Sequence, residues 1–346
     1  MTLDMSTEPD LRRDAPLLVV HAAAGGSTGF GHLARCGAIV EASRRRGWRA
    51  ELIVETVDPA EVATSLPADA TLLPDGAAAR RHRRRVAATH GGPAVLACDL
   101  PDRRIADLAQ AKADGFALTA LLNADPNDPA PADAVFLRGR PSDQPVPARC
   151  IMTGNDYEVV RPEVRALRPR QPWGGDSIDS VLVSFGGSDP GHQTEQLAAA
   201  LQNRPLPEVI LIAGPSFGQQ RYEDLRHLVQ PPVSVVSDPQ SLPELMLDAD
   251  LVISMGGQSV LEALHLGRPV AAVRWADLGR DVEWLADQGL VLDLGAVEQA
   301  GAALEHALQA PRELADLAEA GWRAIDGGGA DRCVDAIATC LAARAN

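Results

Sequence analysis

The sequence of 346 residues is too long for one ordinary hydrophobic core and suits two domains of roughly 150 residues each. Hydrophobic residues make up 46% and charged residues 23%, so the composition excludes a disordered chain and a small disulfide scaffold. The formal net charge of -15 repels phosphate backbones and argues against nucleic acid as a partner.

Two residue types exclude further classes of function. Lys112 is the single lysine, so the chain has no P-loop and Lys112 is the one candidate for Schiff-base chemistry. The five cysteines are widely spread and never form a C-x-x-C pair, which favours a reducing cytoplasm without structural zinc. Cys333 and Cys340 lie seven residues apart on a predicted helix, and we expect both to be small buried apolar residues and not redox partners.

The first predicted elements form a β-loop-α-β unit. Residues 1–16 lack the apolar region of a targeting peptide, so they are expected to be a flexible tail. Unbroken apolar runs at 17–21 and 50–55 indicate buried parallel strands around a helix at 32–46, which predicts a doubly wound sheet. The same patterns predict further strands at 70–73, 94–99, 119–122 and 134–137, and helices at 80–89 and 105–113.

A proline-rich stretch at 141–177 separates this pattern from a second one, because repeated proline bars a continuous helix. We therefore expect a first domain at 17–155, a linker at 156–177, a second domain at 178–330, and a helix at 331–346 that could pack back on the first domain. The strands expected in the second domain are 180–185, 209–213, 233–236, 251–254 and 270–273, with helices at 193–201, 259–266 and 282–288. No stretch approaches the roughly 18 apolar residues of a membrane span, so a membrane partner is not expected.

Glycine-rich turns follow three of the predicted strands, at 25–31, 186–191 and 256–259. Such a turn lets backbone N–H groups approach an anion at the start of a helix, whereas the alternative is that the glycines only permit tight turns. None of the turns has the G-x-G-x-x-G spacing followed by an acidic residue, so a nicotinamide cofactor is not favoured.

The third turn is the most informative. Gly256 and Gly257 end a predicted strand, Gln258 and Ser259 start a helix, and Glu262 lies one turn further on the face of Ser259. Backbone amides here could hold a diphosphate while the carboxylate accepts hydrogen bonds from ribose hydroxyls, so a nucleotide diphosphate is the predicted ligand. Alternatively, the carboxylate only complements the helix dipole.

Longer motifs carry a family resemblance. Residues 29–36 read G-F-G-H-L-A-R-C and residues 184–190 read S-F-G-G-S-D-P, with shorter matches at 99–102, at 154–157 together with 161–163, and at 328–332. In this order they resemble the GT-B nucleotide-sugar enzymes, closest to the UDP-sugar hydrolases of the pseudaminic-acid pathway and related to the UDP-N-acetylglucosamine-using glycosyltransferases of peptidoglycan synthesis. The resemblance implies an α/β fold with two Rossmann-like doubly wound domains facing across a cleft.

The resemblance also implies a site. His32 would be the catalytic base, with an ordinary residue at a helix start as the alternative; Asp189 could instead cap a helix. The residues expected to bind substrate are Gly29, Gly31, Arg35, Gly187, Ser188, Asp189, Gly256, Gly257, Gln258, Ser259, Glu262 and Asp277. No metal site is expected, because the other histidines lack a paired ligand at metal spacing.

Two departures from the hydrolases bear on the reaction. Residues 21–24, His-Ala-Ala-Ala, stand where the hydrolases carry an arginine and an aspartate, and residues 277–280 replace an Asn-Gln pair. We therefore expect a cytoplasmic inverting glycosyltransferase that uses a UDP-sugar as co-substrate, no other cofactor, and a small-molecule acceptor such as cytosine in nucleoside-antibiotic biosynthesis. The alternatives are a UDP-sugar hydrolase with water activated by His32, and a non-catalytic nucleotide-sugar-binding protein.

Two lesser features have competing interpretations. The basic run at 80–85 is expected to be a solvated helix face, with a nucleic-acid patch as the less favoured alternative. Trp275 and Trp284 flank the divergent residues 277–280, where each could be buried or could stack on a sugar or base.

Overall fold

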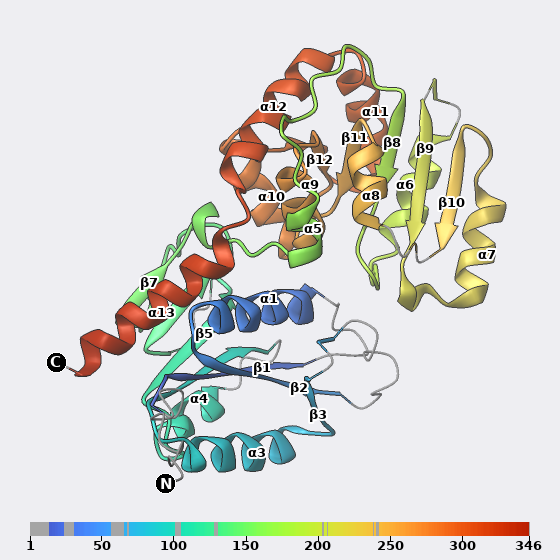
Figure 1. Ribbon diagram of the computed structural model, residues 1–346. Helices are drawn as coiled ribbons and strands as arrows, with labels where there is room; N and C mark the ends of the chain where they lie inside the picture. Colours follow the sequence, from blue (N-terminus) through green and yellow to red (C-terminus); the bar gives the residue numbers. More distant parts are fainter. Residues whose placement is uncertain are drawn as a thin grey trace, which may run out of the picture.

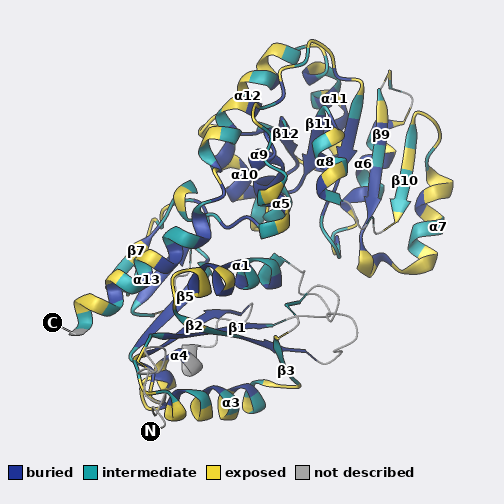
Figure 2. Ribbon diagram, viewed as in Figure 1, coloured by how far each residue is buried: buried dark blue, intermediate teal, exposed yellow. Residues whose placement is uncertain are grey.

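The computed structural model describes residues 14–23, 31–56, 66–67, 69–100, 105–127, 131–202, 204–205, 207–237, 239 and 242–345. These residues form two α/β units, each a parallel sheet covered by helices, with the second unit above the first in Figure 1. The buried residues follow the strands of both sheets, while the outer faces of the helices are exposed (Figure 2). No helix in these ranges is long and apolar enough to cross a bilayer.

The first unit is a seven-stranded sheet in the order β3-β2-β1-β4-β5-β6-β7. Leu18 and Val20 of β1 pack toward α1 and α13, whereas Leu17 and Val19 pack toward α3 and α4. Because both faces are covered, the strands are the unbroken apolar runs of the sequence. The elements are β1 (Leu17–Ala23), α1 (Gly31–Arg45), β2 (Arg49–Glu55), β3 (Thr71–Leu73), α3 (Gly76–Thr89), β4 (Ala94–Asp99), α4 (Ile105–Ala111), β5 (Leu118–Ala124), β6 (Ala134–Leu137) and β7 (Cys150–Met152).

The second unit is a six-stranded sheet in the order β10-β9-β8-β11-β12-β13. Its paired strands are parallel, so the carboxyl ends of neighbouring strands lie at one edge. The elements are β8 (Ser180–Val183), α6 (Gln193–Leu201), β9 (Glu208–Ala213), α7 (Gly218–Leu228), β10 (Val233–Ser237), α8 (Leu242–Asp248), β11 (Leu251–Ser254), α9 (Gln258–His265), β12 (Val270–Ala272), α10 (Leu278–Asp287), β13 (Leu292–Asp293), α11 (Val297–Ala307) and α12 (Pro311–Ala324).

The chain crosses between the units twice. The first crossing follows β7 through the 3-10 helix η2 (Asn155–Tyr157) and the short helix α5 (Pro162–Ala166). The second leads from α12 into α13 (Gly329–Ala345), which lies against α1 in the first unit (Figure 1). β7 falls at the end of the expected first domain, inside the proline-rich stretch at 141–177 where no strand was expected. At three residues it is too short to give an alternating or apolar pattern.

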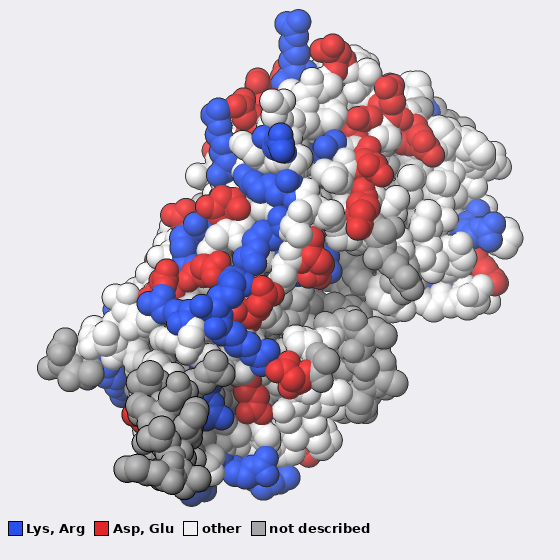
Figure 3. Space-filling view, viewed as in Figure 1, with Lys and Arg blue, Asp and Glu red and all other residues white. Residues whose placement is uncertain are grey.

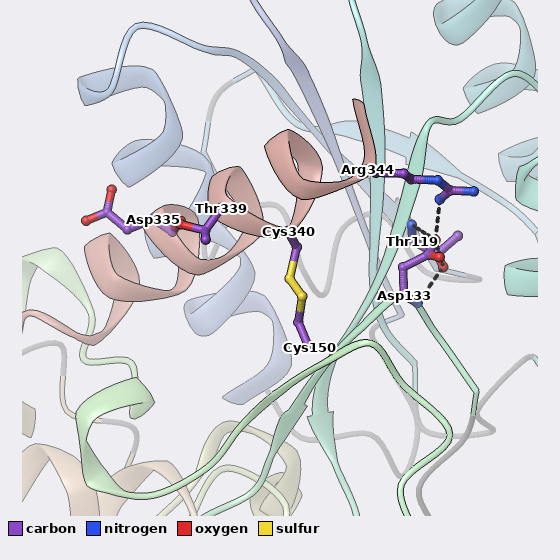
Figure 4. The surroundings of a disulfide bond; sticks show 7 residues. All are labelled: Thr119, Asp133, Cys150, Asp335, Thr339, Cys340 and Arg344. Carbon is purple, nitrogen blue, oxygen red and sulfur yellow. Dashed lines mark hydrogen bonds and ion pairs between the residues drawn. A yellow bond between two sulfur atoms is a disulfide. The ribbon is translucent and has the colours of Figure 1, made fainter. Parts of the chain in front are cut away.

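A disulfide corrects the expectation for Cys340. Cys340 of α13 is bonded to Cys150 of β7 across a Cα–Cα distance of 6.4 Å (Figure 4). The two residues are separated by 190 positions, so only the return of α13 to the first sheet brings them together. Cys36, Cys98 and Cys333 are buried and are not disulfide-bonded, and for Cys333 the expected buried position is confirmed.

The basic run on α3 is also partly different from its prediction. Its arginines are exposed except Arg83, which is fully buried and has its Nη1 3.3 Å from Nδ1 of His21. The Nε2 of His21 lies 2.7 Å from Glu55 Oε1, so the charge of Arg83 belongs to a buried polar cluster. The expectation of a solvated face was wrong for this position because Arg83 lies on the side of α3 that faces the sheet.

Candidate active site

A cavity of about 940 Å³ lies between the two units, where loops at the carboxyl ends of strands from both sheets approach each other. Its size suits a nucleotide-sized ligand. Most of the residues expected from the sequence to form the site line it: Gly31, His32, Arg35, Gly187, Ser188, Gly256, Gly257, Gln258, Ser259 and Glu262.

His32 lies at the start of α1, and Asp99 orients it. The Nδ1 of His32 donates a hydrogen bond to Oδ1 of Asp99, a carboxylate that is 2% exposed at the end of β4. The neutral ring therefore keeps its lone pair on Nε2. Because β4 is the neighbour of β1 and α1 follows β1, the fold places the two side chains together.

Arg35 is the second partner of Asp99. Its Nε donates to Oδ2 of Asp99 at 2.7 Å, and its Nη2 lies 3.4 Å from Nδ1 of His32. Burial disfavours a charged Asp99, but Arg35 and His32 outweigh it, so the pKa of this carboxyl is lowered. A group that stays anionic holds the imidazole in one tautomer and stabilises its protonated form.

Two helix starts meet across the cavity. A Cβ on Gly31, the first residue of α1, would lie 3.6 Å from Cβ of Gln258, the first residue of α9. Gly256 and Gly257 precede α9 with φ values of 97° and 70°, which only glycine adopts without strain. Residues of both first turns line the same cavity, and the amides at a helix start attract an anion.

Glu262 has a partner that the sequence did not indicate. Nε and Nη2 of Arg161 donate to its two oxygens at 2.6 and 2.7 Å, and Glu262 is 2% exposed. Arg161 lies in the first crossing between the units, so this bidentate pair joins the crossing to α9. A ligand hydroxyl can donate a hydrogen bond to the lone pairs of the Glu262 carboxylate that Arg161 does not use.

Three other predicted residues lie away from the cavity or outside the structure. Asp189 is fully buried and accepts hydrogen bonds from the amides of Gln193 and Thr194, so of its two interpretations the structure shows the helix cap. Asp277 is exposed at the start of α10 and is not among the lining residues. Gly29 lies outside the described residues.

Sequence reasoning missed several lining or supporting residues. Asp99 stood in a motif match but received no role. Arg138 and Asp281 form an ion pair between the units, with Nε and Oδ2 2.6 Å apart, and Glu158 lines the same region. No local sequence pattern indicates Glu158, Arg138 or Asp281, because each comes to the cavity only through the packing of segments that are distant in sequence.

The two tryptophans differ in position. Trp284 lines the cavity, whereas Trp275 packs on the second core and against Gly191, whose added Cβ would lie 2.2 Å from the indole nitrogen. Within the described ranges, no group of three or more His, Cys, Asp or Glu side chains is arranged to hold a metal ion.

Comparison with known proteins gives two partial sequence matches. No family model matches the chain. It is 30% identical over 109 residues to the uncharacterized protein MJ1062 of Methanocaldococcus jannaschii, covering 30% of this chain and 22% of that protein. It is 28% identical over 152 residues to the spore coat polysaccharide biosynthesis protein SpsG of Bacillus subtilis, covering 43% of this chain and 44% of SpsG. Each match thus spans less than half of the relative.

Solved structures match over almost the whole length. MurG of Acinetobacter baumannii superposes with a TM-score of 0.64 at 16% identity, covering 93% of this chain and 99% of MurG. The UDP-GlcNAc 2-epimerase of Neisseria meningitidis, solved bound to UDP-GlcNAc, gives 0.63 at 12% identity, covering 94% and 100%. At this identity the likeness establishes the fold, and the predicted pair of Rossmann-like domains is confirmed.

Proposed function

From the GT-B fold that these likenesses show, we propose that the protein is an inverting glycosyltransferase. Its donor is a UDP-sugar held by the second unit, and its acceptor is a small molecule held against the first. The observation that carries the proposal is His32, which Asp99 orients and which lines the same cavity as the glycine turn at the start of α9.

The geometry suits a single displacement. Nε2 of His32 removes a proton from the acceptor nucleophile as it attacks the anomeric carbon, and the bond from that carbon to the diphosphate oxygen breaks. UDP leaves with the bonding electron pair, and attack from the opposite face inverts the anomeric configuration. Asp99 stabilises the imidazolium that forms.

We assign the stabilisation of the leaving diphosphate's charge to backbone amides. Arg161 is bound to Glu262 and Arg35 to Asp99, so these two lining arginines are already neutralised. Amides at the start of α9 and their helix dipole then stabilise the leaving charge, without a metal ion. Glu262 accepts a ribose hydroxyl through the lone pairs that Arg161 leaves free.

The UDP part of the proposal also draws on the relatives. The Neisseria epimerase was solved with UDP-GlcNAc bound, and it shares the two-unit plan over the whole of its chain. The acceptor proposed from the sequence is a nucleobase such as cytosine in nucleoside-antibiotic biosynthesis. The motif at 29–36 favours a second candidate, UDP-sugar hydrolysis, in which water replaces the acceptor at His32.

The test combines binding and product analysis. UDP at about 100 times its Kd stabilises a protein by roughly 2.7 kcal/mol, so a thermal-shift screen of UDP-sugars identifies the donor. His32→Ala is expected to lower turnover at least about a hundredfold and to leave UDP affinity within about twofold. The exposed His227 of α7 provides the control His227→Ala, with no change expected.

Each failure has a separate meaning. Free sugar and UDP formed equally with and without acceptors would establish the hydrolase instead. UDP affinity without turnover of any UDP-sugar would identify the third alternative, a nucleotide-sugar-binding protein. Full turnover in His32→Ala would remove the histidine from the mechanism, and absence of UDP binding would overturn the donor assignment.

A further inference from the structure

Glu158 is the unusual charged residue of the cavity. Among the described residues, each arginine that lines the cavity forms an ion pair with a carboxylate. The pairs are Arg35 with Asp99 (2.7 Å), Arg44 with Asp69 (2.6 Å), Arg138 with Asp281 (2.6 Å) and Arg161 with Glu262 (2.6 Å). Glu158 forms no ion pair within the same ranges, and its Oε2 has no hydrogen-bond partner there.

The fold holds Glu158 from both sides. Its Oε1 accepts a hydrogen bond from the amide of Gly139 at 2.9 Å. A Cβ on Gly329, at the start of α13, would lie 1.9 Å from the carbonyl oxygen of Glu158, so only glycine permits this approach. The backbone and one carboxylate oxygen are thus fixed, while the other oxygen remains for a ligand.

Neighbouring residues make this wall of the cavity polar. Asn123 lies at a bulge at the end of β5 with φ 52°, a strained value for a non-glycine residue, and its carboxamide has no partner among the described residues. Ala124 accepts a hydrogen bond from the amide of Arg138 at 2.8 Å, which places Asn123 beside the Arg138–Asp281 pair. Trp284 closes the wall against Gly139, whose added Cβ would be 3.6 Å from the indole ring.

The titratable groups that face Glu158 come from four elements or loops. They belong to Arg35 of α1, Arg138 after β6 and Asp281 of α10, and the fourth neighbour is the thiol of Cys333 on α13, which burial and Glu158 keep uncharged by raising its pKa. Burial raises the pKa of Glu158 and Asp281 adds to this effect, whereas Arg35, the Gly139 amide and Arg138 act against it. The carboxyl therefore takes up a proton at a higher pH than an exposed glutamate.

Building on the proposed function, we propose that Glu158 determines acceptor specificity. Its free carboxylate oxygen accepts a hydrogen bond from an N–H or O–H group of the acceptor, and its negative charge excludes acceptors that carry a carboxylate or phosphate. The acceptor class is a neutral or cationic small molecule with a hydrogen-bond donor close to its nucleophilic atom. Asn123 supplies a second polar contact on the same wall.

The experiment uses matched neutral and anionic probes. The donors are UDP-N-acetylglucosamine, UDP-glucose and UDP-glucuronic acid, and UDP release from each is measured with two matched pairs of acceptors. In each pair the first acceptor is neutral and the second anionic: uracil and orotate, and phenol and 4-hydroxybenzoate. Cytosine is tested as a further neutral acceptor. In the wild type, the neutral member of a pair is expected to exceed the anionic member in kcat/KM at least about tenfold. Glu158→Gln is expected to raise the acceptor KM about tenfold and to leave UDP affinity within about twofold.

A pH profile separates this role from a structural one. The acceptor KM of the wild type is expected to rise as the pH falls through the raised pKa of Glu158, and Glu158→Gln should lack this dependence. Glu283→Gln on α10 removes the same charge outside the cavity and serves as the control. Equal thermal unfolding midpoints of the variants would show that folding is intact.

The outcomes distinguish the two proposals. Turnover of a UDP-sugar with unchanged acceptor KM, probe preference and pH profile in Glu158→Gln would overturn the role of Glu158 alone. Preference of the wild type for orotate or 4-hydroxybenzoate would also overturn it, whereas release of UDP with water as the only acceptor would overturn the transferase and the role of Glu158 together. No turnover of any UDP-sugar by the wild type would overturn the proposed function itself.

Discussion

Asp99 shows how one residue gives the proposed base its chemistry. It is buried at the end of β4, where it binds both His32 and Arg35. Arg35 also satisfies the second oxygen, so the carboxylate can remain charged in a buried position. The chemical character of His32 thus depends on a side chain 67 residues away.

Asp99→Asn should therefore impair turnover and spare donor binding. An amide cannot stabilise the imidazolium as a carboxylate does, and it can fix the ring in the wrong tautomer, so we expect kcat to fall by about 10²- to 10⁴-fold. Steady-state kinetics and UDP titration measure the two effects. Asp143→Asn, with a side chain that is 91% exposed, is the control, and a kcat like that of the wild type in Asp99→Asn would remove Asp99 from the mechanism.

Arg83 is a charged residue that lies in the interior of the first unit. It lies in a run of exposed arginines, yet it is fully buried beside His21 and Glu55. Removing one member of a buried charged cluster leaves the others uncompensated, so we expect Arg83→Ala to lower the free energy of unfolding by about 3–5 kcal/mol. Arg84→Ala should change it by less than about 0.5 kcal/mol, since Arg84 is exposed.

Urea unfolding of the two variants measures this difference. Similar losses for Arg83→Ala and Arg84→Ala would contradict the buried position of Arg83.

At the scale of elements, α13 returns the end of the chain from the second unit to the first. It begins next to Glu158, packs against α1, and is bonded to β7 through Cys340 and Cys150. A covalent link between residues 190 positions apart strongly restricts the unfolded chain, because the entropic cost of closing a loop grows with its length.

Reduction of this disulfide should be visible in thiol counts and in stability. The denatured, unreduced chain is expected to show the three free cysteines and the reduced chain all five. The double substitution Cys150→Ala and Cys340→Ala should lower the free energy of unfolding by roughly 2–5 kcal/mol. Five reactive thiols before reduction would show that the bond does not form, and Cys333→Ala would serve as a control that removes a free thiol.

At the scale of the whole molecule, arginine–carboxylate pairs connect the units on the face where they meet. Arg165 of α5 lies 3.6 Å from Glu41 of α1 and 3.5 Å from Asp331 of α13, and Arg45 of α1 holds Asp331 from within the first unit at 2.8 Å. On the face drawn in Figure 3, basic and acidic side chains lie next to one another where the two units meet. The many arginines of the sequence here act in pairs and do not form a free basic patch.

The second crossing between the units is fixed by Asp326. Arg332 donates two hydrogen bonds to its carboxylate, and Nε of Arg332 donates to the carbonyl of Asp156 in η2, which belongs to the first crossing. The hydrogen bond from Arg332 lowers the pKa of Asp326 from 3.8 to about 2. Protonation of Asp326 therefore weakens the ion pair that joins the second crossing to the start of α13.

This shift predicts the pH dependence of stability. A carboxyl whose pKa is lower in the folded state stabilises it fully above the ordinary value of 3.8, and the contribution is lost as the pH falls from there through the folded pKa of about 2. The side chain is 51% exposed, so screening limits the contribution to about 1 kcal/mol. The difference in unfolding free energy between wild type and Asp326→Asn should be constant near neutral pH, shrink below the ordinary pKa of 3.8 and vanish below the folded pKa of about 2. A difference that grows on acidification would contradict it.

The sequence by itself determined the class of fold and most strands. It also indicated His32, Gly256 and Gly257, which line the cavity. Unbroken apolar runs predict buried parallel strands, and glycines at strand ends permit the backbone conformations seen there, so both signals are local. It missed β7 and β13, which are three and two residues long, because such strands are too short for a pattern.

Only the tertiary structure decided which side chains meet. The contacts of His32 with Asp99, of Glu262 with Arg161 and of Cys150 with Cys340 join residues 67, 101 and 190 positions apart. No periodicity or spacing encodes such pairs. They arise from strand order and from the return of the chain to the first unit, which depend on the packing of both cores together.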